Sequence, residues 1–146
     1  MSDLLIGSTS SDDQAVSLIY GSTLLDYGSD PFPLVDADHR FSAFTTGGGG
    51  DIDGDGLVDI VVRDHDYLEI YYGHTLRSGV IEGPDAILRD GPEDDCGYTG
   101  TGYCNPYYQK TTSIVGDINN DGFDDLLIGR SATERMDGEV NVFLGQ

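Results

Sequence analysis

The sequence predicts an all-β protein built from repeated antiparallel strands, and two recurring segments support this. The first begins with aspartate and occurs at Asp3–Gly7, Asp59–Arg63 and Asp124–Gly129. The second ends in glycine and occurs at Val16–Gly21, Leu68–Gly73 and Val140–Gly145. No window combines the apolar spacing of an amphipathic helix with capping residues, so we predict no helix.

The glycine-ending segments alternate between apolar and polar residues. Four positions before the closing glycine stands a polar residue in each copy: Ser17, Glu69 and Asn141. One, three and five positions before it, the residues are apolar or aromatic: Tyr20, Leu18, Val16; Tyr72, Ile70, Leu68; Leu144, Val142, Val140. A period of two is typical of a strand with one buried face, so these nine side chains are predicted to face the core.

Further strands complete a larger repeat. Candidate strands at Arg40–Thr46 and Lys110–Val115 precede two acidic loops, and the matching stretches Tyr20–Leu24 and Tyr72–Leu76 lead into another apolar run. The unit is therefore strand, acidic loop, strand, strand, strand. A β-repeat of about 60 residues favours four-stranded antiparallel blades arranged radially, as in a β-propeller.

The chain contains about two and a half such units in a single domain, residues 1–146. We expect a partial blade over 1–38, a full blade over 39–109 and a partial blade over 110–146. The first copy lacks its opening strand and acidic loop, and the third lacks its last strand. A closed propeller needs about four or more blades, so we expect a larger propeller or a homo-oligomer. The strand-like start directly after Met1-Ser2 also resembles a segment of a longer chain.

The charge excludes some classes of protein. A net charge of −20, from 27 acidic and 7 basic residues, does not suit a protein that binds nucleic-acid phosphates through Lys and Arg. No segment approaches the roughly 18 apolar residues of a membrane helix, so no membrane insertion is expected, and no signal-peptide pattern is present. The acidity therefore indicates a bound cation or a salt-adapted surface.

Two loops concentrate this acidity at matching positions. Oxygen-bearing side chains occupy positions 1, 3, 5 and 9: Asp51, Asp53, Asp55 and Asp59 in the first loop, and Asp117, Asn119, Asp121 and Asp125 in the second. Position 6 is Gly56 or Gly122, which allows a sharp turn and lets the carbonyl of Leu57 or Phe123 point inward. Hard oxygen ligands around one point suit Ca²⁺, so the sequence predicts two Ca²⁺ per chain.

Competing interpretations explain the loops less well. An EF-hand needs a bidentate Glu at position 12 and flanking helices, whereas Val62 and Ile128 stand there in strand-like runs. An Asp- and Gly-rich turn without metal would explain one such loop but not two in register. At a free calcium concentration 100 times the dissociation constant, each site adds about 2.7 kcal/mol of stability, which suits a structural role.

The strand, the D-x-D-x-D-G-x-x-D loop, the "DLLIG" strand and the "GxVxVFxG"-type strand together resemble FG-GAP repeats, the blades of integrin α-subunit propellers. The resemblance implies calcium on the hairpin between the first and second strands of a blade, away from the ligand-binding face. The implied ligands are Asp51, Asp53, Asp55, the Leu57 carbonyl and Asp59, and Asp117, Asn119, Asp121, the Phe123 carbonyl and Asp125. The "FG" and "GAP" signatures are replaced here, so integrin-specific partners are not carried over.

One insertion, Asp94–Lys110, stands apart from the repeat. Cys96 and Cys104 predict a local disulfide in an oxidising compartment, with two free thiols as the alternative. Four tyrosines among Gly, Thr and Asn suit a sugar or protein ligand, or else cover a blade edge: Tyr98, Tyr103, Tyr107 and Tyr108.

These features favour a calcium-binding propeller segment that serves adhesion or recognition of a protein or glycan, outside the cell or at its surface. The alternative is a sugar-binding accessory module of a secreted hydrolase or lyase. Catalytic activity is not expected, because no nucleophile motif appears and no paired acid and base can be identified. The histidines, His39, His65 and His74, are scattered over different elements.

Overall fold

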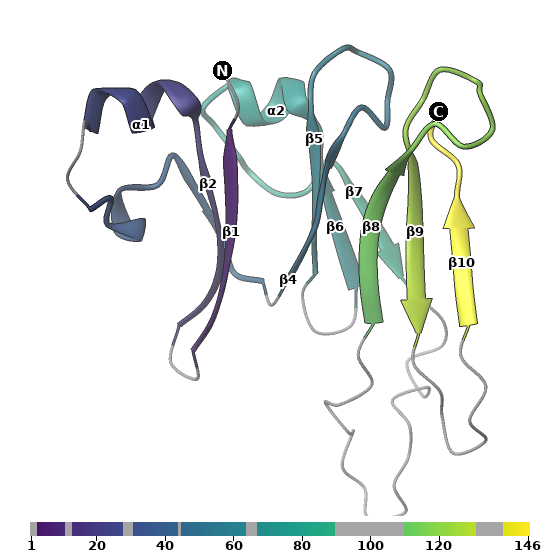
Figure 1. The fold of residues 1–146 in the computed structure, drawn as a ribbon, viewed down its shortest axis with the longest axis horizontal. Coiled ribbons are helices and arrows are strands. Elements are labelled where there is room, and N and C mark those ends of the chain that lie inside the picture. The colour runs from purple at the N-terminus through teal and green to yellow at the C-terminus, as the bar shows by residue number, and fades with distance from the viewer. Residues whose placement is uncertain are drawn as a thin grey trace, which may run out of the picture.

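The structure, a computed structural model, describes residues 3–10, 13–27, 31–43, 45–63, 67–89, 110–130 and 139–146. These residues form three antiparallel sheets (Figure 1). The first sheet has the strand order β1 (Leu4–Ser10), β2 (Asp13–Ile19), β3 (His39–Phe41). The second has the order β4 (Thr45–Gly50), β5 (Asp59–Arg63), β6 (Tyr67–Tyr71), β7 (Ala86–Arg89). The third has the order β10 (Glu139–Phe143), β9 (Asp125–Arg130), β8 (Lys110–Gly116). The predicted all-β class is confirmed for the described residues.

Short helical segments connect some strands. They are α1 (Gly21–Tyr27), the 3-10 turn η1 (Leu34–Asp36) and α2 (Gly73–Arg77). Within the described ranges, no helix combines the length and apolar character needed to cross a membrane.

The predicted strand pairs recur in every sheet. The aspartate-initiated strands are β1, β5 and β9, and each pairs antiparallel with the glycine-ending strand that follows it, β2, β6 or β10. In the second and third sheets, a further strand, β4 or β8, pairs with the aspartate-initiated strand from its other side. The acidic loops therefore connect β4 to β5 and β8 to β9.

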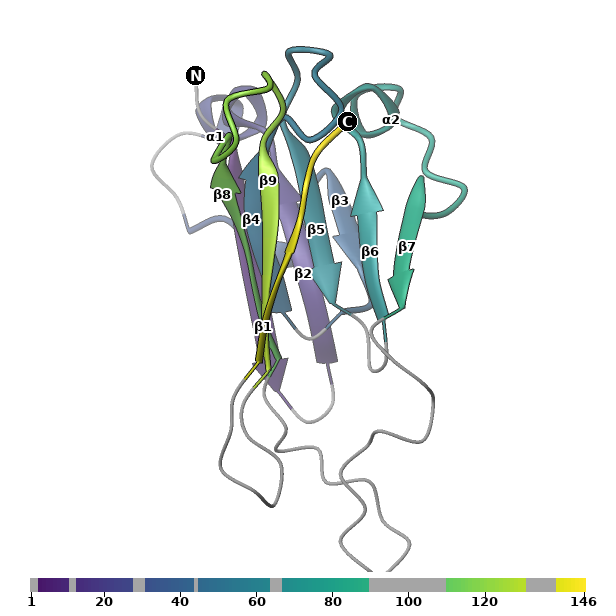
Figure 2. The same cartoon turned by 90° about the vertical axis from the view of Figure 1, so that its right-hand side faces the viewer.

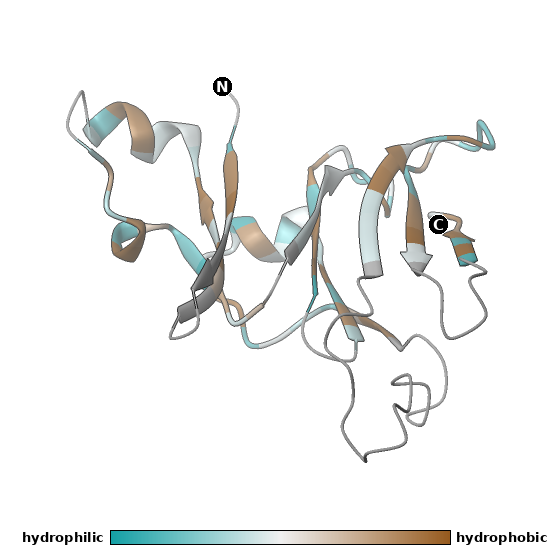
Figure 3. Cartoon of the chain, turned by 60° about the horizontal axis from the view of Figure 1, so that its bottom comes forward, coloured by the Kyte–Doolittle hydropathy of each residue, from teal (hydrophilic) through white to brown (hydrophobic). Residues whose placement is uncertain are grey.

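The three sheets stack face to face, and the second sheet is covered on both sides. On one face, Ile60 and Val62 of β5 join a cluster with Val16 and Phe41 of the first sheet. On the other face, Val61 of β5 joins a cluster with residues of the third sheet. Figure 3 shows apolar residues along these strands. Because both faces are covered, β5 has four consecutive buried residues where a half-buried strand would alternate.

The predicted core positions are buried in β2 and β6 and half-buried at Tyr20 and Tyr72, but in the third copy they are exposed, Leu144 included at 54%. Val16 and Leu18 of β2 face the second sheet, and the equivalent residues of β6, Leu68 and Ile70, face the third; all four are at most 5% exposed. On β10, the equivalent Val140 and Val142 are 63% and 46% exposed. The prediction was wrong for β10 because no described sheet covers that face.

The predicted single strand Arg40–Thr46 is two strands. β3 ends at Phe41, which pairs with Val16 of β2, whereas β4 begins at Thr45, which pairs with Arg63 of β5. The chain passes from the first sheet to the second between them, and Ala43 is buried in the cluster that joins those sheets. The sequence between the two strands contains no glycine or proline, so no turn signal marks the boundary.

The absence of helices was also predicted wrongly. The stretches that follow β2 and β6 are α1, of seven residues, and α2, of five. Helices this short cannot display two turns of apolar periodicity. What the two share is the sequence Tyr-Gly-x-Thr-Leu at their start.

A carboxylate just before the next strand explains this shared sequence. Asp38, which precedes β3, accepts hydrogen bonds from the Tyr20 N–H (2.6 Å) and the Thr23 hydroxyl (2.8 Å). In the second sheet the same contacts, both 2.8 Å, are made by the equivalent residues: Asp85, Tyr72 and Thr75. Each aspartate therefore holds the start of a helix against the beginning of the outer strand.

Replacing Asp85 with alanine is expected to lower the free energy of unfolding by about 1–3 kcal/mol, because two hydrogen bonds of about 0.5–1.5 kcal/mol each are lost. Urea denaturation in calcium-containing buffer measures the change. Asp26→Ala removes the same charge from an exposed position of α1 and is the matched control. Equal destabilisation by the two variants would contradict the role of Asp85.

Candidate metal centres

The two acidic loops, residues 51–58 and 117–124, lie at the same end of the sheets as α1 and α2 (Figures 1 and 2). A register shift precedes each loop, between Thr46 and Gly49 in β4 and between Ile114 and Gly116 in β8. Such bulges bend a strand and redirect the residues that follow. The two loops thus leave their sheets in the same way.

The backbone of the two loops also matches. Position 4 has a positive φ in both, 74° at Gly54 and 62° at Asn120. Position 6 does as well, with 81° at Gly56 and 100° at Gly122. Glycine and asparagine adopt this conformation most readily, which explains both residue types. The turn expected at the position-6 glycine is present in both loops.

In the first loop, three carboxylates converge. Oxygens of Asp51, Asp53 and Asp59 all lie within 4.8 Å of one another. One Asp51 oxygen, Oδ2, accepts a hydrogen bond from the Gly56 N–H (3.0 Å), while Oδ1 is buried without a hydrogen-bond partner. An unpaired buried carboxylate oxygen beside two further carboxylates is costly unless a cation shares the space.

The carboxylate at position 9 is the most enclosed part of the loop. Asp59 is fully buried. Its Oδ2 accepts hydrogen bonds from Ile52 N (2.7 Å) and Asp53 N (3.4 Å), and its Oδ1 accepts one from Gly73 N (2.7 Å). Burial nevertheless raises the pKa of Asp59, because the hydrogen bonds only partly offset the loss of water. A bound cation would favour the ionised form.

The second loop repeats this pattern. Asp125 is fully buried, and it accepts hydrogen bonds from Ile118 N (2.9 Å) and Gly145 N (3.0 Å). At position 1, Asp117 Oδ2 accepts a bond from Gly122 N (2.8 Å). The loops therefore form the same internal hydrogen bonds at positions 1, 2, 6 and 9.

The loops differ at position 3. The second loop has Asn119, whose Nδ2 donates to Asp121 Oδ2 (2.7 Å). At positions 1, 3, 5 and 9 it therefore offers three carboxylates where the first loop offers four. In the part of the chain that the structure describes, the groups of three acidic or histidine ligands within 4.8 Å both draw on the first loop, and one of them also includes His74 of α2.

A contact shared by all three sheets links the aspartate-initiated strand to the closing glycine. The Gly73 and Gly145 amides donate to Asp59 and Asp125, and the first sheet has the same contact between Gly21 N and Asp3 Oδ1 (3.0 Å). A Cβ on Gly145 would lie 2.5 Å from the Asp124 carbonyl oxygen, and one on Gly73 would meet the Leu57 side chain. At Gly73 and Gly145 the neighbouring chain therefore passes too close for a side chain.

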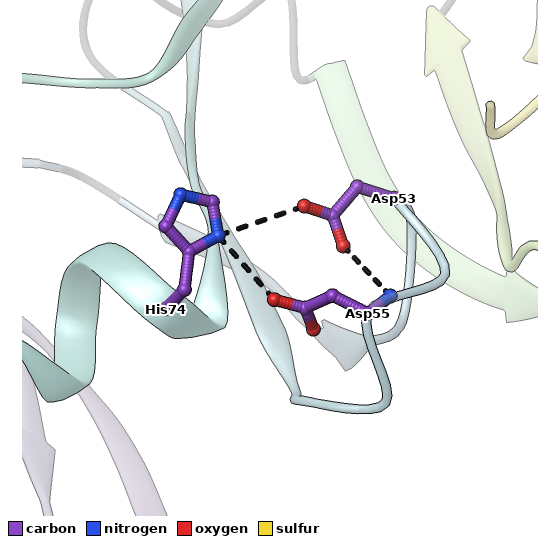
Figure 4. Close-up of side chains that lie close together, drawn as sticks. All are labelled: Asp53, Asp55 and His74. Carbon is purple, nitrogen blue, oxygen red and sulfur yellow. Dashed lines mark hydrogen bonds and ion pairs between the residues drawn. The ribbon is translucent and has the colours of Figure 1, made fainter.

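His74 is a neighbour of the first loop that sequence reasoning missed. Its Nδ1 lies 3.3 Å from Asp55 Oδ2 and 3.7 Å from Asp53 Oδ2 (Figure 4). The only sequence signal is its place directly after the closing glycine, where the third copy has Gln146. His39 contacts the Tyr20 hydroxyl and the Leu76 carbonyl, both at 3.0 Å, away from the acidic loops.

Several predicted site residues lie outside the described residues: Cys96, Cys104, Tyr98, Tyr103, Tyr107 and Tyr108. His65, for which no role was predicted, lies outside them as well. No protein-family model matches the chain. Among the described residues, the groups that could hold a metal are Asp51, Asp53 and Asp59, and Asp53 and Asp55 with His74. Apart from the His74 nitrogen, their donors are oxygen. This donor set fits Ca²⁺ better than zinc or copper, which favour nitrogen and sulfur.

Proposed function

We propose that the chain is a calcium-stabilised β-repeat module in which each acidic loop binds one Ca²⁺. The ligands would be Asp51, Asp53, Asp55, the Leu57 carbonyl and Asp59 in the first loop, and Asp117, Asn119, Asp121, the Phe123 carbonyl and Asp125 in the second. The observation that carries this proposal is the convergence of Asp51, Asp53 and Asp59 in a loop where Asp51 Oδ1 is buried without a hydrogen-bond partner.

The physical case rests on charge. The chain has a net charge of −20, and the loops place carboxylates side by side, where each raises the cost of ionising the next. Two Ca²⁺ would add four positive charges where the repulsion is greatest. Calcium in this proposal is structural: it holds each loop, and through Asp59 or Asp125 it holds the adjoining strands.

Isothermal titration calorimetry should detect two Ca²⁺ per chain, and Asp53→Ala and Asp121→Ala should each remove one, because each deletes a ligand. At calcium 100 times the dissociation constant, each lost site should cost about 2.7 kcal/mol in the free energy of unfolding. Mg²⁺ should bind much more weakly, because it requires a strict octahedron and retains its waters. Asp26→Ala is the control for charge. Equal binding of both ions, or of neither, would contradict the assignment.

We infer further that the three sheets are successive blades of a β-propeller. In support, each sheet packs onto the next through the same positions of its glycine-ending strand, Val16 and Leu18 in one case and Leu68 and Ile70 in the other. Val140 and Val142 of β10 carry the same pattern but are exposed. Because the first two sheets bury the same positions against a neighbouring sheet, we expect another sheet of this repeat to cover the exposed face of β10. We propose that a second copy of the chain supplies that sheet.

Light scattering in calcium should therefore report a dimer or a larger closed assembly, and removal of calcium should loosen it. Val142→Asp should shift the protein towards monomer, because it places a charge in the proposed interface. Val80→Asp introduces the same charge at another exposed valine and should leave the assembly unchanged. A native chain that stays monomeric at micromolar concentrations, with an unchanged melting temperature in chelator, would contradict the proposal.

We assign the module to adhesion or recognition of a protein or glycan in the extracellular space or at the cell surface. Two considerations support this compartment: structural calcium sites fill in millimolar calcium, and a close pair of cysteines is typical of oxidising surroundings.

A further inference from the structure

We propose that the two acidic loops bind calcium as a coupled pair and that Asp124 links them. This inference rests on the proposed calcium function. It concerns how occupancy of one loop changes the affinity of the other.

Asp124 and Asp51 form reciprocal hydrogen bonds between the loops. The Asp51 N–H donates to Asp124 Oδ2 (2.9 Å), and the Asp124 N–H donates to the Asp51 carbonyl (2.8 Å). Asp51 is position 1 of the first loop, and its carboxylate belongs to the converging group. Asp124 is position 8 of the second loop, directly before the buried Asp125. A displacement of Asp51 or of Asp124 is thus passed to the neighbouring loop.

The link is a departure from the repeat. In the first loop, position 8 is Val58, which is 57% exposed. The second loop has a carboxylate at this position, and that carboxylate accepts a hydrogen bond from the backbone of the first loop. Asp124 therefore performs a role that the repeated ligand pattern does not require.

A second path joins the two buried carboxylates. Ile52 donates its N–H to Asp59 Oδ2 (2.7 Å) and accepts at its carbonyl from the Gln146 N–H (3.1 Å). The preceding residue, Gly145, donates to Asp125 Oδ1 (3.0 Å). Asp59 and Asp125 are therefore connected through one residue of the first loop and two residues after β10.

The loops are also in close contact. A Cβ on Gly54 would lie 2.5 Å from the ring of Phe123, and one on Gly50 would lie 2.5 Å from Asp124 Oδ2. Closely packed segments have few independent movements. A cation that fixes one loop therefore removes part of the ordering cost of the other, and this is positive coupling between sites.

The test compares overall and single-site affinities by calorimetry with Ca²⁺ alone. Asp121→Ala isolates the first site, and Asp53→Ala isolates the second. For independent sites, the overall two-ion binding constant of the native chain equals the product of the single-site constants. We expect the native constant to exceed that product at least about fivefold, the lower end of typical coupling.

Two substitutions at one position separate hydrogen bonding from charge. Asp124→Val introduces the residue that the first loop has at position 8, so it suits the loop backbone. It should bring the ratio of the overall two-ion constant to the product of the single-site constants, here called the excess, close to one. Asp124→Asn removes the same charge but keeps a carbonyl oxygen that can accept from Asp51 N, and should retain most of the excess. Melting temperature in calcium verifies that both variants fold.

The outcomes distinguish the two proposals. Two Ca²⁺ that bind the native chain independently would overturn the coupling and leave the calcium function standing. Retention of the full excess in Asp124→Val would overturn the role of Asp124. Failure of the native chain to bind any Ca²⁺ would overturn both.

Discussion

The structure depends on one repeated interaction, in which an aspartate at or just before the start of a strand accepts a hydrogen bond from the glycine that closes the next strand. It joins Asp3 to Gly21, Asp59 to Gly73 and Asp125 to Gly145. The interaction brings the two ends of each strand pair together, and at Gly73 and Gly145 neighbouring atoms leave no room for a side chain. In the second and third sheets the same carboxylate also accepts from a loop amide, so it joins the acidic loop to its sheet.

The position of this interaction explains why the acidic loops lie where they do. The loops, the closing glycines and the short helices gather at one end of the sheets, while the apolar faces meet between the sheets (Figure 1). Asp59 and Asp125 are both fully buried, and at Asp59 the backbone N–H donors offset only part of the cost of burial, as its raised pKa indicates. We propose that a cation bound in each loop offsets the rest of this cost. We propose coupling between the loops because Asp51 and Asp124 share hydrogen bonds across neighbouring sheets.

The sequence predicted what depends on short-range pattern. The strand pairs and the position-6 turns follow from the period of two and from glycine spacing, and the structure confirms them. What depends on long-range contacts was missed. The boundary between β3 and β4 is set by which sheet each strand joins, and α1 and α2 are too short for a periodic signal. Likewise, the approach of His74 to Asp55 and of Asp124 to Asp51 arises only when separate elements meet.

The most direct test of the account is a crystal structure of the chain grown in calcium, with anomalous scattering used to locate the ions. The account predicts one peak in each loop, at about 2.3–2.6 Å from its oxygen ligands. In the first loop Asp51 Oδ1, unpaired here, should be among those ligands, and the Asp59–Gly73 and Asp125–Gly145 contacts should be intact. Well-ordered loops without a peak, or ions bound elsewhere while Asp59 and Asp125 stay buried, would contradict it.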